Sequence, residues 1–239
     1  MSHLSSIRRS SSRLGASVAS LAAIVSIAAC SAIGGADTTR VGSPPYERGS
    51  GNVTTVSRSL DAFHAVSAAQ GVRVSVSNGP SNGAIVTADD NLADNITTEV
   101  RDGTLHVEVS GSIETATPLA VSVTTSTSLD GIIAGTGATV DTEDVSADAL
   151  TVGVSTGASV RAGGRASSID LSVNTGATAD LRNVEAASAL VHVGTGSTAY
   201  VNAGTSVHGD CIGGSTLHVR GAASTVDVAT DVSSSVKRE

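Results

Sequence analysis

Hydrophobic and polar residues alternate along most of the chain after residue 52, and from about residue 129 the alternation repeats around regularly spaced glycines. These glycines are 20, 19, 20 and 18 residues apart, at Gly137, Gly157, Gly176, Gly196 and Gly214. Three residues before them the chain has Ala134, Val154, Val173, Val193 and Cys211, and three residues after them Val140, Val160, Ala179, Ala199 and Leu217. Period-2 alternation on both sides of a turn predicts two short strands per repeat, each with one face turned inward.

Repeats of this length cannot bury an apolar face alone, but stacked repeats share a continuous interior. A third, shorter apolar segment around Val145 and Val184 closes each coil. Parallel crossovers are overwhelmingly right-handed. We therefore expect an all-β fold, a right-handed parallel β-helix with coils of about 20 residues.

Two other repeat architectures have similar periods but different residue requirements. Leucine-rich repeats need several Leu and a characteristic Asn in each repeat, and calcium-binding nonapeptide coils need glycine runs with a regularly spaced Asp. The chain has neither pattern. The threonine before each turn glycine predicts a ladder of hydroxyl groups with a structural role, at Thr136, Thr156, Thr175 and Thr195.

The N-terminal half is also β-patterned, and its blocks resemble a known family. The blocks are Gly71-Val-Arg-Val-Ser-Val, then Ala88-Asp-Asp-Asn-Leu, then Val100-Arg-Asp-Gly-Thr-Leu-His-Val, followed by the Gly-Thr-Gly coils. In this order they are similar to the head GIN domain of putative autotransporter adhesins, over roughly residues 52–230. The resemblance implies a right-handed β-helix on a secreted or lipid-anchored bacterial protein, and it brings no catalytic or ligand residues with it.

The N-terminus has the layout of a lipoprotein signal peptide. Arg8, Arg9 and Arg13 precede an uncharged stretch from Leu14 to Ala36. Within it, Ile27-Ala-Ala-Cys30 resembles a bacterial lipobox, so we expect lipidation at Cys30. An uncleaved anchor is the alternative, because about 20 apolar residues can cross a bilayer. The expected organisation is a signal peptide at 1–29, a flexible tether at 30–51, a GIN-like β-helix domain at 52–230 and a polar tail at 231–239.

The composition limits which residues can fill the interior and which partners the protein can bind. The chain has no Trp, two Tyr and one Phe, so a thin core of Val, Ile, Leu and Ala is expected instead of an aromatic one. The net charge is −8, and residues 1–29 carry three arginines and no acid, so the rest of the chain is more acidic still. Such a chain lacks the excess of positive charge with which proteins bind the phosphates of nucleic acid.

Candidate chemistry in the sequence is sparse. His106, His192 and His218 lie between apolar residues, where alternation turns them outward, and their spacing is not that of metal ligands. His208, Asp210 and Cys211 are adjacent enough to suggest a nucleophile, but Cys211 occupies an inward column and is expected to be a buried apolar residue. The acids Asp130, Asp170 and Asp180 are scattered, and Asp89, Asp90 and Asp94 lie in a turn-rich loop where solvated acids are ordinary.

These patterns predict a non-catalytic, lipid-anchored protein of the cell envelope, exposed outside the cytoplasm, with a role in adhesion or envelope organisation. The expected partners are the membrane, through Cys30, and an unidentified envelope or surface ligand; no cofactor, metal or nucleic acid is expected. A carbohydrate-binding or carbohydrate-active β-helix is one alternative, because polysaccharide lyases and hydrolases share such folds. Self-assembly into a homo-oligomer is another, because the ends of a β-helix expose strand edges.

Overall fold

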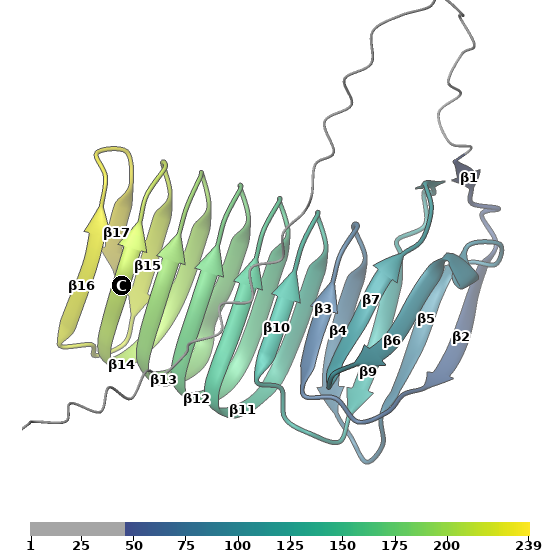
Figure 1. The fold of residues 1–239 in the computed structure, drawn as a ribbon, viewed down its shortest axis with the longest axis horizontal. Helices are drawn as coiled ribbons and strands as arrows, with labels where there is room; N and C mark the ends of the chain where they lie inside the picture. Colours follow the sequence, from purple (N-terminus) through teal and green to yellow (C-terminus); the bar gives the residue numbers. More distant parts are fainter. Residues whose placement is uncertain (1–45) are drawn as a thin grey trace, which may run out of the picture. The chain divides into compact units, whose positions relative to one another are not determined.

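Residues 46–239 are described by a computed structural model, and they form strands and turns with a single short 3₁₀ helix, η1 (Ala93–Asn95). The regular part is a stack of bent strands, namely β11 (Thr139–Val154), β12 (Ser159–Val173), β13 (Thr178–Val193) and β14 (Thr198–Cys211). Each pairs in parallel with the next (Figure 1). The prediction of a parallel β-helix is confirmed. Within the described range, no helix is long and apolar enough to cross a membrane.

The predicted columns are in register from coil to coil. Val140 pairs with Val160, and Val154 with Val173, along the β11–β12 ladder. The same columns continue through Ala199 and Leu217 to the last coils, which are β15 (Thr216–Arg220), β16 (Thr225–Thr230) and β17 (Ser235–Arg238). Because side chains alternate between the two faces of a strand, this register turns every second residue inward.

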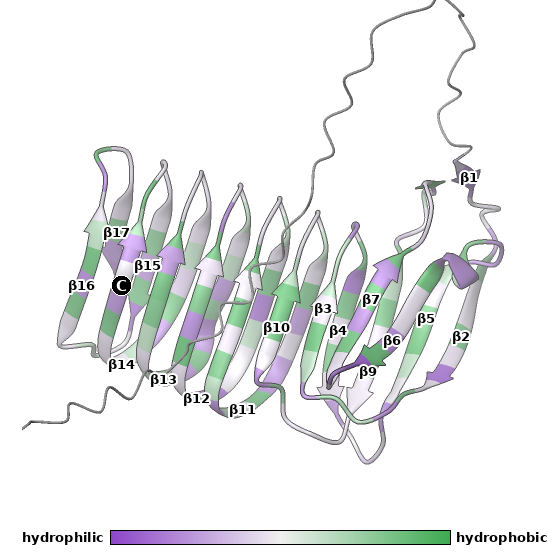
Figure 2. Cartoon of the chain, viewed as in Figure 1, coloured by the Kyte–Doolittle hydropathy of each residue, from purple (hydrophilic) through white to green (hydrophobic). Residues whose placement is uncertain are grey.

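The interior is narrow and aliphatic, as the composition predicts. Alternating bands of hydrophobic and hydrophilic residues run along each strand in Figure 2. Val160, Leu171 and Val191 have no exposed surface, and Phe63 is the one buried aromatic residue among those described. Cys211 is completely buried at its column position, so the expectation that it replaces a buried valine is confirmed.

The tight turns between coils differ from the predicted hydroxyl ladder. Thr136, Thr156, Thr175 and Thr195 all have positive φ, and so do the glycines that follow them. The turns connect through the backbone, because Gly137 N–H donates to the carbonyl of Thr156 and Gly157 N–H to that of Thr175. The side chains of these threonines are exposed, and the hydrogen bonds between successive turns in residues 46–239 join peptide groups, so the predicted hydroxyl ladder is wrong.

At the opposite end of each coil the strand bends through a corner. In β11 this corner lies near residue 145. The β11–β12 register shifts between Thr142 and Val145. Gly164 in β12 has a φ of 126°, and a Cβ there would lie 2.1 Å from the carbonyl oxygen of Val145. The corner of this coil therefore requires glycine.

The N-terminal part continues the stack and then closes it with antiparallel strands. β10 (Gly131–Ala134), β3 (Ala65–Ala68), β7 (Thr104–Val109), β4 (Arg73–Asn78) and β9 (Ala120–Thr125) pair in parallel, whereas β2 (Val53–Ser59), β5 (Gly83–Asp89) and β6 (Ile96–Arg101) pair antiparallel with their neighbours. The guanidinium of Arg58 on β2 donates to the carbonyls of Ala93 and Ile96 and to Thr98 Oγ1. It thereby joins the two edge strands of this end.

Two strands lie in segments that the sequence predicts to be irregular. β1 (Glu47–Arg48) pairs with β8 (Ile113–Glu114) inside the expected tether, because Glu47 and Gly49 N–H groups find carbonyl partners at residues 112 and 114. β17 pairs with β15 inside the expected polar tail, where Val236 continues an inward column opposite Leu217. The signal peptide and Cys30 lie outside the described residues.

Candidate binding face

The strands that follow the tight turns form one outward surface, which we call the post-turn face. It comprises β9, β4, the first halves of β11–β14, β15 and β17, and its centre is a single column of residues in register across the coils. The column reads Ser122, Ser75, Asp141, Arg161, Asp180, Tyr200, His218 and Lys237. Charged and aromatic side chains therefore follow one another at one per coil, or about every 4.8 Å.

Asp180 is the best-held charge in this column. Arg182 donates to both of its carboxylate oxygens, with Nε–Oδ1 at 2.9 Å and Nη2–Oδ2 at 2.7 Å. Arg161 from the preceding coil lies at 3.9 Å from Oδ2. Hydrogen bonding by the Arg182 side chain holds the pKa of Asp180 below its ordinary value, and the carboxylate in turn raises the pKa of Arg182. Because Arg182 occupies both oxygens, Arg161 is left with most of its donors facing solvent.

Tyr200 is enclosed by cationic and aromatic groups from the coils on either side. The guanidinium carbon of Arg182 lies 4.3 Å from the ring centroid, and the His218 ring stacks at 4.4 Å with an interplanar angle of 24°. His218 Nδ1 also lies 2.8 Å from Glu239 Oε1. The ring faces of Tyr200 are thus used within the protein, and what it offers to a ligand is its edge and hydroxyl.

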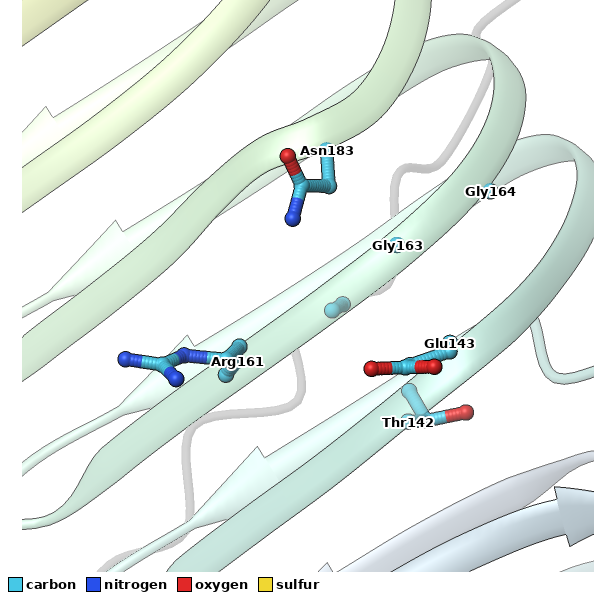
Figure 3. Close-up of a pocket in the computed structure, with 7 residues that line it drawn as sticks. Thr142, Glu143, Arg161, Gly163, Gly164 and Asn183 are labelled. Carbon is cyan, nitrogen blue, oxygen red and sulfur yellow. The ribbon is translucent and has the colours of Figure 1, made fainter.

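Hollows lie along the same face. One of about 470 Å³ is bordered by charged and hydroxyl-bearing residues, namely Arg73, Arg161, Arg182, Asp141, Asp180, Thr139, Ser159, Thr178 and Tyr200. A second, of about 320 Å³, has Glu143, Arg161 and Asn183 around a floor of Gly163 and Gly164 (Figure 3). The missing side chains of the glycine pair create this second hollow, because neighbouring coils carry larger residues at the corner.

The opposite, pre-turn face has a different charge. It comprises β7, β3, β10, the second halves of β11–β14 and β16, and these segments contain no Arg or Lys. Its acids are Glu108, Asp148, Asp170, Asp210 and Asp227. The post-turn face therefore carries arginines together with the acids Asp141, Glu143 and Asp180, whereas the pre-turn segments carry acids and histidines but no Arg or Lys.

The histidines singled out in the sequence do not converge on a site. His192 Nδ1 lies 2.5 Å from Asp210 Oδ1, whereas His106 and His218 are on different faces. Among the residues that the structure describes, no three His, Cys, Asp or Glu side chains could hold a metal ion together. His208 lies 4.0 Å from Asp227, and Cys211 is buried away from it.

The acidic group at residues 89–94 is not uniformly solvated. Asp90 and Asp94 are exposed, but Asp89 is only 1% exposed. Its carboxylate accepts hydrogen bonds from Thr117 Oγ1 at 2.6 Å and Thr115 Oγ1 at 2.7 Å. These bonds, that from Thr117 first, hold the pKa of Asp89 below its ordinary value. The expectation of ordinary solvated acids is wrong for Asp89, which anchors the segment that follows β8.

The post-turn column was not recognised in the sequence, although a signal for it exists. Asp141, Arg161, Asp180, Tyr200 and His218 each lie four residues after a turn glycine. The alignment of the turn glycines that predicts the inward columns also places all five on one outward line. The residue types change from coil to coil, so no repeated letter marks the column.

A solved structure with a similar backbone supports the fold. A crystal structure of a putative adhesin from Bacteroides fragilis superposes with a TM-score of 0.65 at 15% identity, covering 80% of this chain and 99% of the other. A putative lipid binding protein from Parabacteroides distasonis gives a TM-score of 0.48 at 15% identity, covering 82% and 100%. No curated protein sequence matches.

The family described as "Putative auto-transporter adhesin, head GIN domain" matches residues 62–223, which is well over half of the chain. The match covers the antiparallel strands β5 and β6, the regular coils and most of the post-turn face, and it begins after β2. This chain belongs to the GIN-domain family of putative auto-transporter adhesins.

Proposed function

We propose that this protein is a lipid-anchored, non-catalytic component of the cell envelope that acts by binding a surface ligand through its post-turn face. The observation that carries the proposal is the column from Asp141 to Lys237, in which recognition groups repeat at fixed spacing on a stacked backbone. A rigid row of this kind needs little ordering when a ligand binds. The adhesin-like family supports a location at the cell surface.

Anchoring rests on the sequence. The lipobox-like Ile27-Ala-Ala-Cys30 follows a basic start and an uncharged stretch, which is the arrangement that lipoprotein processing requires. A lipid on Cys30 would tether the β-helix to a membrane and leave both of its faces in solvent.

Self-assembly through the coil ends is the less favoured alternative. At the N-terminal end, Arg58 joins the edge strands β2 and η1–β6 through three hydrogen bonds. At the other end, Arg238 Nη2 lies 3.4 Å from the carbonyl oxygen of Ala223. A charged side chain laid across each end opposes edge-to-edge pairing.

The experiment that tests the anchoring is the intact mass of the membrane-extracted protein beside a Cys30→Ser variant. We expect a chain that begins at Cys30 and carries a diacylglycerol and a fatty acyl group, and we expect the variant to lack both. An unprocessed mass in the parent protein would contradict the lipoprotein assignment and indicate an uncleaved anchor.

A further inference from the structure

We propose that the ligand of the post-turn face is an anionic polymer, whose carboxylate or phosphate groups lie along the coil stack against Arg73, Arg161, Arg220 and Lys237. This rests on the proposed function in that the protein acts by binding, but it does not depend on the anchor at Cys30.

The first argument is the availability of the cations. Arg182 is committed to Asp180 and to the ring of Tyr200. Arg73, Arg220 and Lys237 are exposed and make no ion pair within residues 46–239, and Arg161 has one long contact, at 3.9 Å, with 68% of its side chain exposed. These groups keep the donors that bind carboxylate or phosphate oxygens.

The second argument is the placement of the cations. Arg73 lies on β4, Arg161 on β12, Arg220 on β15 and Lys237 on β17, all on one face. At one strand spacing per coil, they extend over roughly 30 Å of the stack. The hollow bordered by Arg73 and Arg161 runs across the neighbouring strands from β4 to β14, so this surface fits an extended chain with repeated charges better than a small molecule.

The third argument is the contrast between the two faces. The pre-turn segments have no Arg or Lys and carry Glu108, Asp148, Asp170, Asp210 and Asp227. Because the whole chain is acidic, with a net charge of −8, a polyanion is repelled by most of the surface and meets its attractive groups on the post-turn face. Asp141, on the strand between those of Arg73 and Arg161, is joined on this face by Glu143 and by Asp180, which Arg182 pairs, and these acids limit the attraction.

The test measures binding of the purified full-length chain to immobilised polygalacturonate, polyphosphate and neutral dextran. We expect binding to a polyanion that weakens as salt is raised, and none to dextran. The Arg73→Gln, Arg161→Gln double variant should bind about tenfold or more weakly, since losing one charge-assisted contact costs at least that factor. Preference between polygalacturonate and polyphosphate identifies the carboxylate or the phosphate as the group recognised.

The matched control is Arg165→Gln. Arg165 is on the same strand, beyond the corner, 83% exposed at its side chain and 3.4 Å from Glu185. The Arg165→Gln variant should bind the polyanion as the parent protein does, and all variants should have the parent's urea midpoint. A second diagnostic is Asp141→Asn, which should tighten binding by removing a repelling charge.

Three results would overturn the proposal: equal binding to dextran, equal loss in Arg165→Gln, or weaker binding in Asp141→Asn. Weaker binding in Asp141→Asn would mean that the Asp141 carboxylate accepts hydrogen bonds from the hydroxyl groups of a neutral glycan. The mass measurement on Cys30 tests lipidation and the binding measurement tests the post-turn face, so failure of the anchor and failure of the polyanion site are distinguishable.

Discussion

The guanidinium carbon of Arg182 lies 4.3 Å from the centroid of the Tyr200 ring, and the two residues come from adjacent coils. His218 stacks on the same ring from the next coil. In a stack of parallel strands, side chains in one column are held at the strand spacing, so the guanidinium of Arg182 and the rings of Tyr200 and His218 can stack on one another. These contacts connect β13, β14 and β15 outside the core.

Replacing Tyr200 with Ala should therefore destabilise the protein by roughly 1 to 3 kcal/mol, the combined size of one cation–π contact and one aromatic pair. Tyr200→Phe keeps the ring and should stay within about 0.5 kcal/mol of the parent. Urea unfolding followed by circular dichroism measures both. Equal losses in the two variants would assign the effect to the hydroxyl group and contradict the stacking account.

Changing Val173 to Asp should prevent folding or cause aggregation. Val173 is completely buried between Val154 and Val193 in an inward column, and an unpaired carboxylate there costs several kcal/mol, a large part of a typical domain's stability. The neighbouring Ser172→Asp turns the same charge outward and should fold normally. Size-exclusion chromatography and urea unfolding compare the two, and a reversed order would show that the register is shifted by one residue.

The inward columns could be predicted from the sequence because alternation around a turn is a local property. Residues such as Val160 and Leu171 occupy the positions that the turn glycines predict. The outward column was missed because its chemistry changes at each coil. The burial of Asp89 depends on Thr115 and Thr117, which are more than 20 residues away, and no local pattern marks such a pairing.

The turns show a second limit of sequence reasoning. The repeated threonine before each turn glycine predicts a hydroxyl ladder, but positive φ at Thr136 and Thr156 turns these side chains to solvent and leaves the ladder to the backbone. Repetition of a residue type indicates a shared environment. It does not indicate which group of that residue makes the contacts.

Ser197 should be replaceable by Ala with a gain in stability of about 1 kcal/mol. Its Oγ is buried and is the one such side-chain atom in the described residues without a hydrogen-bond partner, while Ala158 and Ala177 hold the equivalent position in earlier coils. Removing an unsatisfied buried hydroxyl removes its desolvation penalty. Thermal and urea unfolding measure the gain.

The matched comparison is Ser215→Ala in the next coil. Ser215 Oγ donates to the carbonyl of Ile212 or Val193, at 2.8 and 2.9 Å, so its loss should cost about 1 to 2 kcal/mol. Opposite signs at two serines of one column would show that hydrogen-bond satisfaction, and not side-chain volume, decides stability inside the turn. Losses of the same size at both serines would refute this.

Acidification should weaken the N-terminal end of the β-helix through Asp89. Hydrogen bonds from Thr117 and Thr115 lower the pKa of this carboxyl in the folded state, so the unfolded chain takes up its proton first as the pH falls. The stabilisation is complete above the unfolded pKa of about 4 and is lost as the pH falls through the lower folded value. We therefore expect urea midpoints that are level near neutral pH and decline below about pH 4. Asp89→Asn should have a lower midpoint at pH 7 and a shallower acid decline, because its amide carries no titrating charge.

The control is Asp94→Asn, which replaces an exposed acid in the same loop and should keep the parent's profile. An unchanged acid decline in Asp89→Asn would assign the pH dependence to other carboxylates.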